Sequence, residues 1–226
     1  MRGSDIEIGV GEYYHLYSRG VLKQKIFLDR CDYIRFLFLI LHFQSPVNLF
    51  NLSRPTTSFV KSQTFNIADD TVQQIIKQRT VGLNVFCLMP NHFHLIVQEV
   101  ETSGIAKFMQ RTLTAYAKYF NTKYKRTGHL FESAYQIVPI TDNDQLLYVS
   151  AYVHKNPVEI TGDYQNYQWS SFQDYTVENR WDKLLDQEII NEQFTDNENE
   201  YATWVKNTTA KELNDNLEDL AGLLAC

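Results

Sequence analysis

A chain of 226 residues can form one substantial domain, or one domain with an extension. Its composition, 44% hydrophobic and 21% charged, is that of an ordinary globular protein rather than a disordered or fibrous one. No stretch approaches the roughly 18 consecutive apolar residues of a membrane span, so the sequence predicts no membrane partner.

The formal net charge of −6 combines two regions of opposite character. Residues 181–226 hold three Lys/Arg and eleven Asp/Glu, a balance of −8, whereas residues 1–180 have a balance of +2. Within that part, residues 101–130 carry six basic residues and one acidic residue. The basic segment is compatible with a polyanionic partner, although a solvated helix face explains the same pattern.

The first residues, MRGSDIEIGVG, lack the apolar core of a signal peptide. The three cysteines, Cys31, Cys87 and Cys226, have neither metal-site nor disulfide spacing, which fits a reducing compartment. We therefore expect a cytoplasmic protein.

The predicted elements alternate between strands and helices. Residues 12–19 (EYYHLYSR) have strand composition and end at Gly20. Apolar residues at helical spacing predict a helix over 29–43, with Asp29 as a plausible N-cap. The later elements are a polar surface excursion at 45–70, a short helix at 72–78, strands at 81–89 and 93–97, a long helix at 103–123, a loop at 125–128, a strand at 134–140 and a helix at 142–156.

The helix at 142–156 is expected to have its cap near Asn143 or Asp144 and to stop at Pro157. The order β, α, β, β, α, β, α predicts an α+β fold. Its first six elements match the ferredoxin-like βαββαβ arrangement, an antiparallel sheet with helices on one face.

Two histidines interrupt an apolar strand pattern in the segment CLMPNHFHLIVQ. Residues i and i+2 of a strand point to the same face, about 7 Å apart, so His92 and His94 can offer two imidazoles to one metal ion. Phe93 points to the opposite face. Two histidines on a polar sheet face are more often unliganded, so the spacing alone does not indicate a metal site.

A second group of polar residues lies in the segment YVHKNP. On a helix Tyr152 and Asn156 are four residues apart and share a face. Tyr152 could act as a nucleophile and Asn156 could offer an amide oxygen to a metal. The alternatives are a packing tyrosine and an asparagine that ends the helix before proline.

Together these motifs resemble the single-tyrosine HUH transposases, and more narrowly the REP-associated tyrosine transposases of bacteria. The resemblance covers about residues 12–175 and includes YHLYSRG, CLMPNHFHLIV, YAKYFNTKYKRTGHLFES, YVHKNPVEI and WSS in order. One departure is FESAYQ, where Ser133 and Ala134 stand at positions at which relatives often carry Gly-Arg. The resemblance implies the α+β fold predicted above, with a C-terminal catalytic helix.

The resemblance also implies an activity. Tyr152 would attack a phosphodiester of single-stranded DNA, leaving a 5′-phosphotyrosine link and a free 3′-OH. His92, His94 and Asn156 would hold a divalent ion, Mg²⁺ or Mn²⁺. The partner would be single-stranded or hairpin DNA at repeats, and the protein would be a monomer or a homodimer associated with the nucleoid.

Residues near these motifs have assignable roles as well. Candidate contacts to DNA phosphates are Arg19, Lys123, Lys125, Arg126 and His129, and candidate platforms for unpaired bases are Tyr116, Tyr119, Phe120 and Tyr124, of which Tyr116 and Phe120 fit the core equally. On a helix His154 faces away from Tyr152, so we expect a structural or DNA-proximal role. His15 fits a hydrogen-bonded core histidine better than a place at the site.

Residues 1–178 are expected to form the transposase-like catalytic domain, and 179–226 an acidic, partly helical extension. Two other functions remain open. One is a domesticated, non-catalytic DNA-binding protein on the same fold, and the other is an unrelated metal-dependent hydrolase, for example a zinc enzyme that uses the histidine pair. Against the zinc enzyme, no further His, Cys or acidic residue has the spacing that completes a zinc site.

Overall fold

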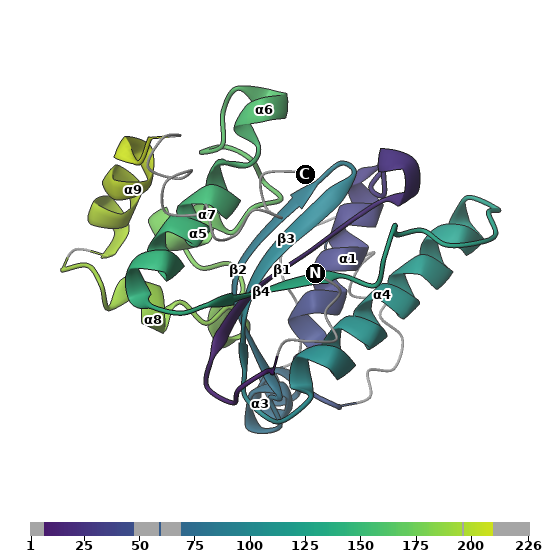
Figure 1. Ribbon diagram of the computed structural model, residues 1–226, viewed down its shortest axis with the longest axis horizontal. Helices are drawn as coiled ribbons and strands as arrows, with labels where there is room; N and C mark the ends of the chain where they lie inside the picture. Colours follow the sequence, from purple (N-terminus) through teal and green to yellow (C-terminus); the bar gives the residue numbers. More distant parts are fainter. Residues whose placement is uncertain (1–6, 48–58, 60–68, 196, 210–226) are drawn as a thin grey trace.

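The computed structural model describes residues 7–47, 59, 69–195 and 197–209 (Figure 1). The N-terminal MRGS and most of the excursion predicted at 45–70 lie outside these residues. Two short 3-10 helices occur at Val21–Lys23 and Asp182–Leu184. The strands are β1 (Tyr13–Arg19), β2 (Val81–Met89), β3 (His92–Glu99) and β4 (Gln136–Ile140); the α-helices are α1 (Arg30–His42), α3 (Asp69–Lys77), α4 (Gly104–Lys123), α5 (Asn143–Lys155), α6 (Val158–Thr161), α7 (Phe172–Thr176), α8 (Glu188–Asn191) and α9 (Asn197–Asn207).

The four strands form one antiparallel sheet in the order β2-β3-β1-β4. This order arises when two β-α-β units interleave, so the predicted ferredoxin-like α+β fold is confirmed. The two central strands are β3 and β1, and Tyr17 pairs with His94 while Arg19 pairs with His92. The histidine motif therefore lies in the middle of the sheet rather than at an edge.

The two faces of the sheet are covered by different helices. Figure 1 shows α1 and α4 on one side and α5, α7 and α9 on the other. Phe93 points toward α1, where its ring lies 4.9 Å from that of Phe36, centroid to centroid. His94, one residue on, faces α5. Because successive strand residues alternate between faces, packing Phe93 in the core fixes where the histidines point.

Aspartate side chains cap the N-termini of α1 and α5, the helices that pack on the two faces of the sheet near the histidines. Asp29 caps α1 in a reciprocal capping box with Asp32, as the sequence predicted for Asp29. At α5 the N-cap is Asp142, directly before Asn143, which agrees with a cap near Asn143 or Asp144. Its side chain accepts a hydrogen bond from the Gln145 backbone N–H. Asp142 has an extended backbone, which lets its carboxylate accept this hydrogen bond from the first turn of the helix.

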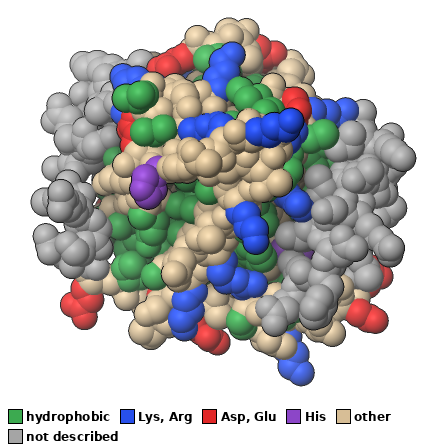
Figure 2. Space-filling view, turned by 90° about the vertical axis from the view of Figure 1, so that its right-hand side faces the viewer, with side chains coloured by type: hydrophobic (Ala, Val, Ile, Leu, Met, Phe, Trp, Pro, Cys, Tyr) green, Lys and Arg blue, Asp and Glu red, His purple; other side chains and the backbone are tan. Residues whose placement is uncertain are grey.

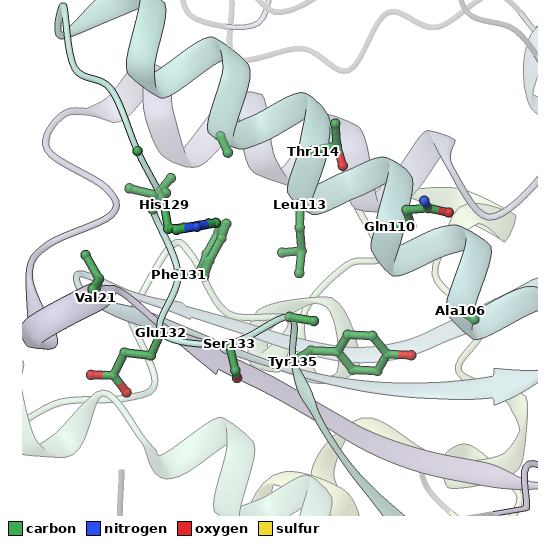
Figure 3. Close-up of a pocket in the computed structure, with 14 residues that line it drawn as sticks. Val21, Ala106, Gln110, Leu113, Thr114, His129, Phe131, Glu132, Ser133 and Tyr135 are labelled. Carbon is green, nitrogen blue, oxygen red and sulfur yellow. The ribbon is translucent and has the colours of Figure 1, made fainter. Parts of the chain in front are cut away.

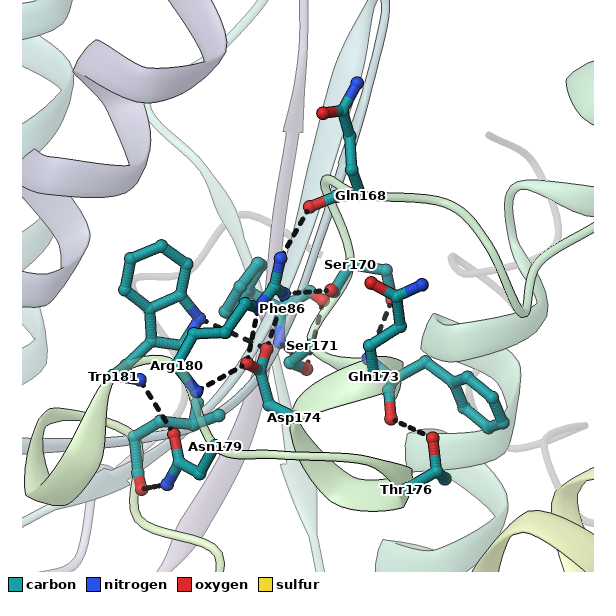
Figure 4. A network of polar contacts seen from close by, with 12 residues as sticks. Phe86, Gln168, Ser170, Ser171, Gln173, Asp174, Thr176, Asn179, Arg180 and Trp181 are labelled. Carbon is teal, nitrogen blue, oxygen red and sulfur yellow. Dashed lines mark hydrogen bonds and ion pairs between the residues drawn. The ribbon is translucent and has the colours of Figure 1, made fainter. Parts of the chain in front are cut away.

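The chain after α5 returns along the free edge of β2. The backbone N–H of Leu88 donates to the Trp169 carbonyl, and that of Ser171 donates to the Phe86 carbonyl. Next to this contact, the buried Asp174 carboxylate accepts hydrogen bonds from the Arg180 guanidinium and from the Trp181 indole N–H (Figure 4). This pairing covers an edge of the sheet that would otherwise be exposed.

Residues beyond 178 contribute to the same hydrophobic core as those before it. Trp181, Leu184, Ile190, Tyr201 and Val205 are each at most 1% exposed. The division into a catalytic domain and an acidic extension at residue 178 remains a prediction, and part of the extension lies outside the described residues. In the part that the structure describes, no helix is long and apolar enough to cross a membrane.

Candidate active site

The two histidines of β3 lie on the face of the sheet that α5 covers. His94 is fully buried and His92 is 8% exposed, and their ring centroids are 4.9 Å apart. On the neighbouring strand β1, Tyr17 and Arg19 stand opposite them. The sheet face that carries the two histidines is thus buried beneath a helix, and the space around their side chains is called the pocket below.

Helix α5 brings Tyr152 and Asn156 to this pocket. The ring of Tyr152 is half-buried and stands edge-on to His94, with 5.6 Å between centroids. Asn156 is the C-cap of α5, and its Oδ1 lies 3.0 Å from Nε2 of His92. The i, i+4 spacing on the helix and the i, i+2 spacing on the strand therefore converge on one place.

Both histidines are neutral near pH 7. Burial lowers the pKa of His92 to about 4, against the opposing effect of its contact with Asn156, and the charge of Arg19 lowers it further. Burial also holds the pKa of His94 well below its usual value, with smaller contributions from His92 and His15. Neutral imidazole has a free lone pair and is the form that binds metal ions.

The polar atoms of the pocket fit a divalent cation. His92 has Asn91 Oδ1 2.8 Å from its Nδ1 and Asn156 Oδ1 3.0 Å from its Nε2. Both oxygens are acceptors, and a neutral imidazole has one N–H, so one of the two contacts sets a lone pair against a lone pair. A cation between His92 Nε2 and Asn156 Oδ1 removes this conflict.

The second histidine supports the same interpretation. Nε2 of His94 is buried and has no hydrogen-bond partner among the described residues. A buried polar atom without a partner costs free energy, and a bound ion would satisfy it. The described residues contain no cluster of three His, Cys, Asp or Glu suited to a metal, so the candidate donor set is two imidazoles and one amide oxygen. Such a mixed nitrogen and oxygen set suits Mn²⁺, or Mg²⁺ with water and phosphate oxygens.

His15 differs from the sequence-based expectation of a satisfied core histidine. It is fully buried, but its Nδ1 has no partner among the described residues, and its Nε2 lies 3.0 Å from Nδ1 of His94. The rings of His15 and His94 stack nearly parallel, 8° apart, and the ring of Tyr152 stands edge-on to both. His15 therefore belongs to the site.

His154 lies on the far side of α5 from Tyr152. Of its two predicted roles, structural or DNA-proximal, the structural one is confirmed. His154 is fully buried; its Nδ1 lies 2.7 Å from the Tyr201 hydroxyl and its Nε2 2.9 Å from Ser171 Oγ. The Tyr201 hydroxyl donates to Ser150 Oγ, so it accepts from Nδ1–H of His154. Nε2 then accepts from the Ser171 hydroxyl, which shares its one hydrogen between His154 and the Phe86 carbonyl. A neutral His154 satisfies every member of this chain.

This chain of hydrogen bonds joins α5 to two other elements. Ser150 and His154 belong to α5, Tyr201 to α9, and Ser171 Oγ accepts from the Phe86 N–H of β2. Satisfied buried networks of this kind fix one packing arrangement. The helix that carries Tyr152 is thus held to the sheet and to α9 through its rear face.

Among the predicted DNA contacts, Arg19 lies closest to the histidines. It pairs with His92 across the sheet and its guanidinium forms an ion pair with Glu132 at 3.2 Å. Lys123 is engaged within the protein, since its ammonium contacts Asp29 and the buried Asp32 at 2.7 Å each. Arg126 lies over the Phe120 ring. Lys125 and His129 are exposed.

The aromatic residues of α4 and its C-cap are mostly internal. Tyr116 is fully buried and its hydroxyl donates to the Ile26 carbonyl, and Phe120 is 2% exposed. These two belong to the core, which excludes them as platforms for bases. Tyr119 and Tyr124 are half-buried, and both donate their hydroxyls to Asp32.

A cavity of about 790 Å³ lies between α4 and the segment 128–135 (Figure 3). Leu113 of α4 and Phe131 of the facing segment line it, together with His129 and Tyr135. His92, His94 and Tyr152 are not among its lining residues. Figure 2 shows Lys and Arg side chains spread over the face of the molecule that carries α4, beside a patch of hydrophobic side chains.

Two residues, one at the site and one behind α5, were not identified from the sequence. Asn91 lies within the quoted motif, directly before His92, and its position there is the signal that could have identified it. Tyr201 lies in the acidic region, and nothing in the local sequence pattern indicates that it reaches α5.

Comparisons with known proteins bear on this arrangement. Residues 55–156 match the family described as "Transposase IS200 like", a segment that contains both histidines, Tyr152 and Asn156. No curated protein matches the chain. A solved structure described as "Structure of the REP associates tyrosine transposase bound to a REP hairpin" is similar, with a TM-score of 0.49, 12% identity and coverage of 77% of this chain and 85% of that chain.

Proposed function

We propose that this chain, whose residues 55–156 match the family described as "Transposase IS200 like", is a metal-dependent endonuclease and strand transferase for single-stranded DNA. The nucleophile is Tyr152, and the metal ligands are His92, His94 and Asn156. The substrate is DNA with a hairpin next to the cleaved strand, a feature that rests on the resemblance of the motifs.

The observation that carries the proposal is the convergence of four side chains from two elements. The Tyr152 ring lies 5.6 Å from that of His94, and Asn156 Oδ1 lies 3.0 Å from His92 Nε2. All four come from one chain, so a single copy contains the complete set. A protein that only binds DNA has no use for a tyrosine placed against two neutral imidazoles and an amide oxygen.

The reaction is a transesterification. The Tyr152 oxygen forms a bond to phosphorus as the bond from phosphorus to the 3′-oxygen breaks. The downstream fragment stays linked to the protein through its 5′-phosphate, and the upstream fragment leaves with a free 3′-OH. The phenol loses its proton and the leaving oxygen gains one. Since the ordinary pKa of tyrosine is about 10, the phenol needs a neighbouring positive charge or base to react near neutral pH.

A bound divalent ion would supply Lewis-acid polarisation of the phosphate and stabilise the leaving oxygen. The protein's own residues hold the groups in place. His92 and His94 present neutral imidazoles from a rigid central strand, and α5 fixes Tyr152 and Asn156 one helical turn apart. Arg19, opposite His92, lies where its charge can attract the phosphate of a strand that enters the pocket.

Exposed basic residues would supply the part of the affinity for DNA that does not depend on its base sequence. Lys107 and Lys118 on α4, and Lys125 and His129 after it, are exposed on the described surface. Contacts of this type release counterions from DNA and weaken as salt concentration rises. We assign them to the hairpin backbone.

The test is an incubation of the purified protein with a single-stranded hairpin DNA labelled at either end, with Mg²⁺ or Mn²⁺. A covalent protein–DNA adduct with the 5′-phosphate side and a free 3′-OH product is expected. Tyr152→Phe should abolish the adduct while it keeps the ring in place. Tyr148→Phe, which removes the hydroxyl of another half-buried tyrosine on the same helix, is the matched control and should retain the adduct.

Two outcomes would overturn the proposal in different ways. Metal-dependent cleavage without an adduct would indicate a hydrolase that uses the histidine pair. Hairpin binding without cleavage under either metal would indicate a domesticated DNA-binding protein.

A further inference from the structure

Each of the two candidate metal-binding histidines has a partner on its Nδ1 atom. Nδ1 of His92 lies 2.8 Å from Asn91 Oδ1, and Nδ1 of His94 lies 3.0 Å from Nε2 of His15. Asn91 is the neighbour of His92 in sequence, whereas His15 comes from β1, 79 residues away from His94. Two residues from different strands or loops therefore contact the equivalent Nδ1 atom of the two histidines.

The partner of Nδ1 decides which nitrogen can bind an ion. A neutral imidazole carries one proton, and the other nitrogen has the lone pair. If Nδ1–H donates to an outer acceptor, the Nε2 lone pair is free for a metal. Asn91 Oδ1 can only accept, so when a cation lies between His92 Nε2 and Asn156 Oδ1, the contact with Asn91 places the proton on Nδ1.

For His94 the same result requires His15 to accept through Nε2. His15 is fully buried, its ring stacks on those of Tyr17 and His94, and its Nε2 faces His94. As a simple core residue it would be unfavourable, because its Nδ1 has no partner among the described residues. An apolar side chain of similar volume would fill the space without that cost. A role at the site explains why a histidine occupies this place.

We propose that His15 and Asn91 are positioning residues, which hold His94 and His92 in the tautomer whose Nε2 lone pair faces the metal site. The proposal rests on the metal site of the proposed function. It adds two residues outside the set of ligands, and it states that β1 contributes a side chain to the geometry of that site. Such outer partners orient metal-ligating histidines and raise their basicity.

The first test compares two substitutions of His15 in the full chain by titration with Mn²⁺, followed by electron paramagnetic resonance of the free ion. His15→Phe keeps a stacking ring and removes the acceptor, and it should weaken Mn²⁺ binding by about 10- to 100-fold. His15→Gln places an amide oxygen near the position of Nε2 and should restore most of the affinity. Hairpin binding without metal should be unchanged in both.

A parallel pair tests Asn91. Asn91→Leu removes the acceptor and should weaken Mn²⁺ binding by a similar factor, whereas Asn91→Asp keeps an acceptor oxygen and should not. If a folded His15→Phe protein and a folded Asn91→Leu protein bind Mn²⁺ as tightly as the wild type does, the proposal is wrong.

A measurement on the metal-free protein separates this proposal from the proposed function. Long-range ¹H–¹⁵N NMR spectra of the imidazoles report which nitrogen carries the proton. The expected result is Nδ1–H for both His92 and His94 in the wild type, with loss of that preference at His94 in His15→Phe. Protonation of Nε2 in the wild type would overturn the positioning role. Absence of Mn²⁺ binding in the wild type, with Nδ1–H observed, would instead overturn the proposed metal site.

Discussion

The ring of Tyr152 stands edge-on to the ring of His94, 5.6 Å away, although 58 positions separate them in the chain. Two separate constraints produce this relationship. The strand alternation that buries Phe93 turns His94 toward α5, and the hydrogen bonds of His154 and Ser150 fix the rear of α5.

The role of Asn156 as a metal ligand predicts a specific pattern of substitutions. Asn156→Ala removes the oxygen that faces His92 Nε2, and adduct formation should fall by more than about 100-fold, beyond the loss expected for an outer partner. Asn156→Asp keeps an oxygen donor and should retain part of the activity. The measurement is the initial rate of adduct formation at saturating Mn²⁺. Equal rates in the alanine variant and the wild type would contradict the ligand role.

The buried hydrogen-bond chain behind α5 predicts a stability effect. Tyr201→Phe leaves Nδ1–H of His154 and the Ser150 hydroxyl with one partner fewer, and it should lower the free energy of unfolding by about 1–3 kcal/mol. Urea unfolding followed by circular dichroism measures this change. Tyr148→Phe, on a half-buried ring beside Trp204, is the control and should cost less than about 1 kcal/mol. Equal effects of the two substitutions would exclude a special role of the chain.

Buried neutral histidines predict acid sensitivity. Burial lowers the pKa of His154 to about 3 and that of His42 to about 4, whereas an unfolded histidine titrates near 6.5. Below about pH 6.5 the unfolded state therefore binds protons that the folded state does not, so stability falls as pH drops and is recovered as pH rises.

Between pH 7 and pH 5.5 each such histidine should cost about 1 kcal/mol of unfolding free energy. The check is urea unfolding at both pH values for the wild type and for His42→Leu. The variant should lose less stability over this interval than the wild type does. An identical loss in the two proteins would show that His42 does not contribute.

Two neighbouring lysines should behave differently toward DNA. Lys123 contacts Asp29 and Asp32, so Lys123→Gln should lower stability by about 2 kcal/mol and change the salt dependence of hairpin binding little. Lys125 is exposed, so Lys125→Gln should leave stability unchanged and reduce the slope of log affinity against log salt by about one. Fluorescence anisotropy at several salt concentrations measures the slope. The reverse pattern would contradict the assignment of Lys125 to phosphate.

The sequence predicts the elements that local patterns encode. Strand composition and helical spacing located β1 and α1, and the i, i+2 and i, i+4 rules grouped His92 with His94 and Tyr152 with Asn156. The order of elements then fixed the sheet, because few connections join a βαββαβ chain into one layer. The cap of α5 was located near Asn143 or Asp144 but not assigned to Asp142, since all three residues are good caps and backbone geometry selects among them.

The contacts that complete the site depend on pairing between distant segments. His15 meets His94 because β1 pairs with β3 in one register, and a shift of one residue would turn it to the other face. Lys123 meets Asp32 across the contact of α4 with α1, so this candidate DNA contact also forms an internal ion pair. Tyr201 reaches His154 from a region that composition marks only as acidic. None of these contacts can be recognised from the residues next to it in the sequence.

The most direct test of the account is to identify the residue that becomes linked to DNA. The adduct formed with a hairpin substrate and Mn²⁺ would be digested with protease and nuclease and analysed by mass spectrometry. If Tyr152 is the nucleophile, a nucleotide should be attached through phosphate to the peptide that contains Tyr152, with the modification on the tyrosine oxygen. Attachment at any other residue, or an adduct that persists in Tyr152→Phe, would contradict this role of Tyr152.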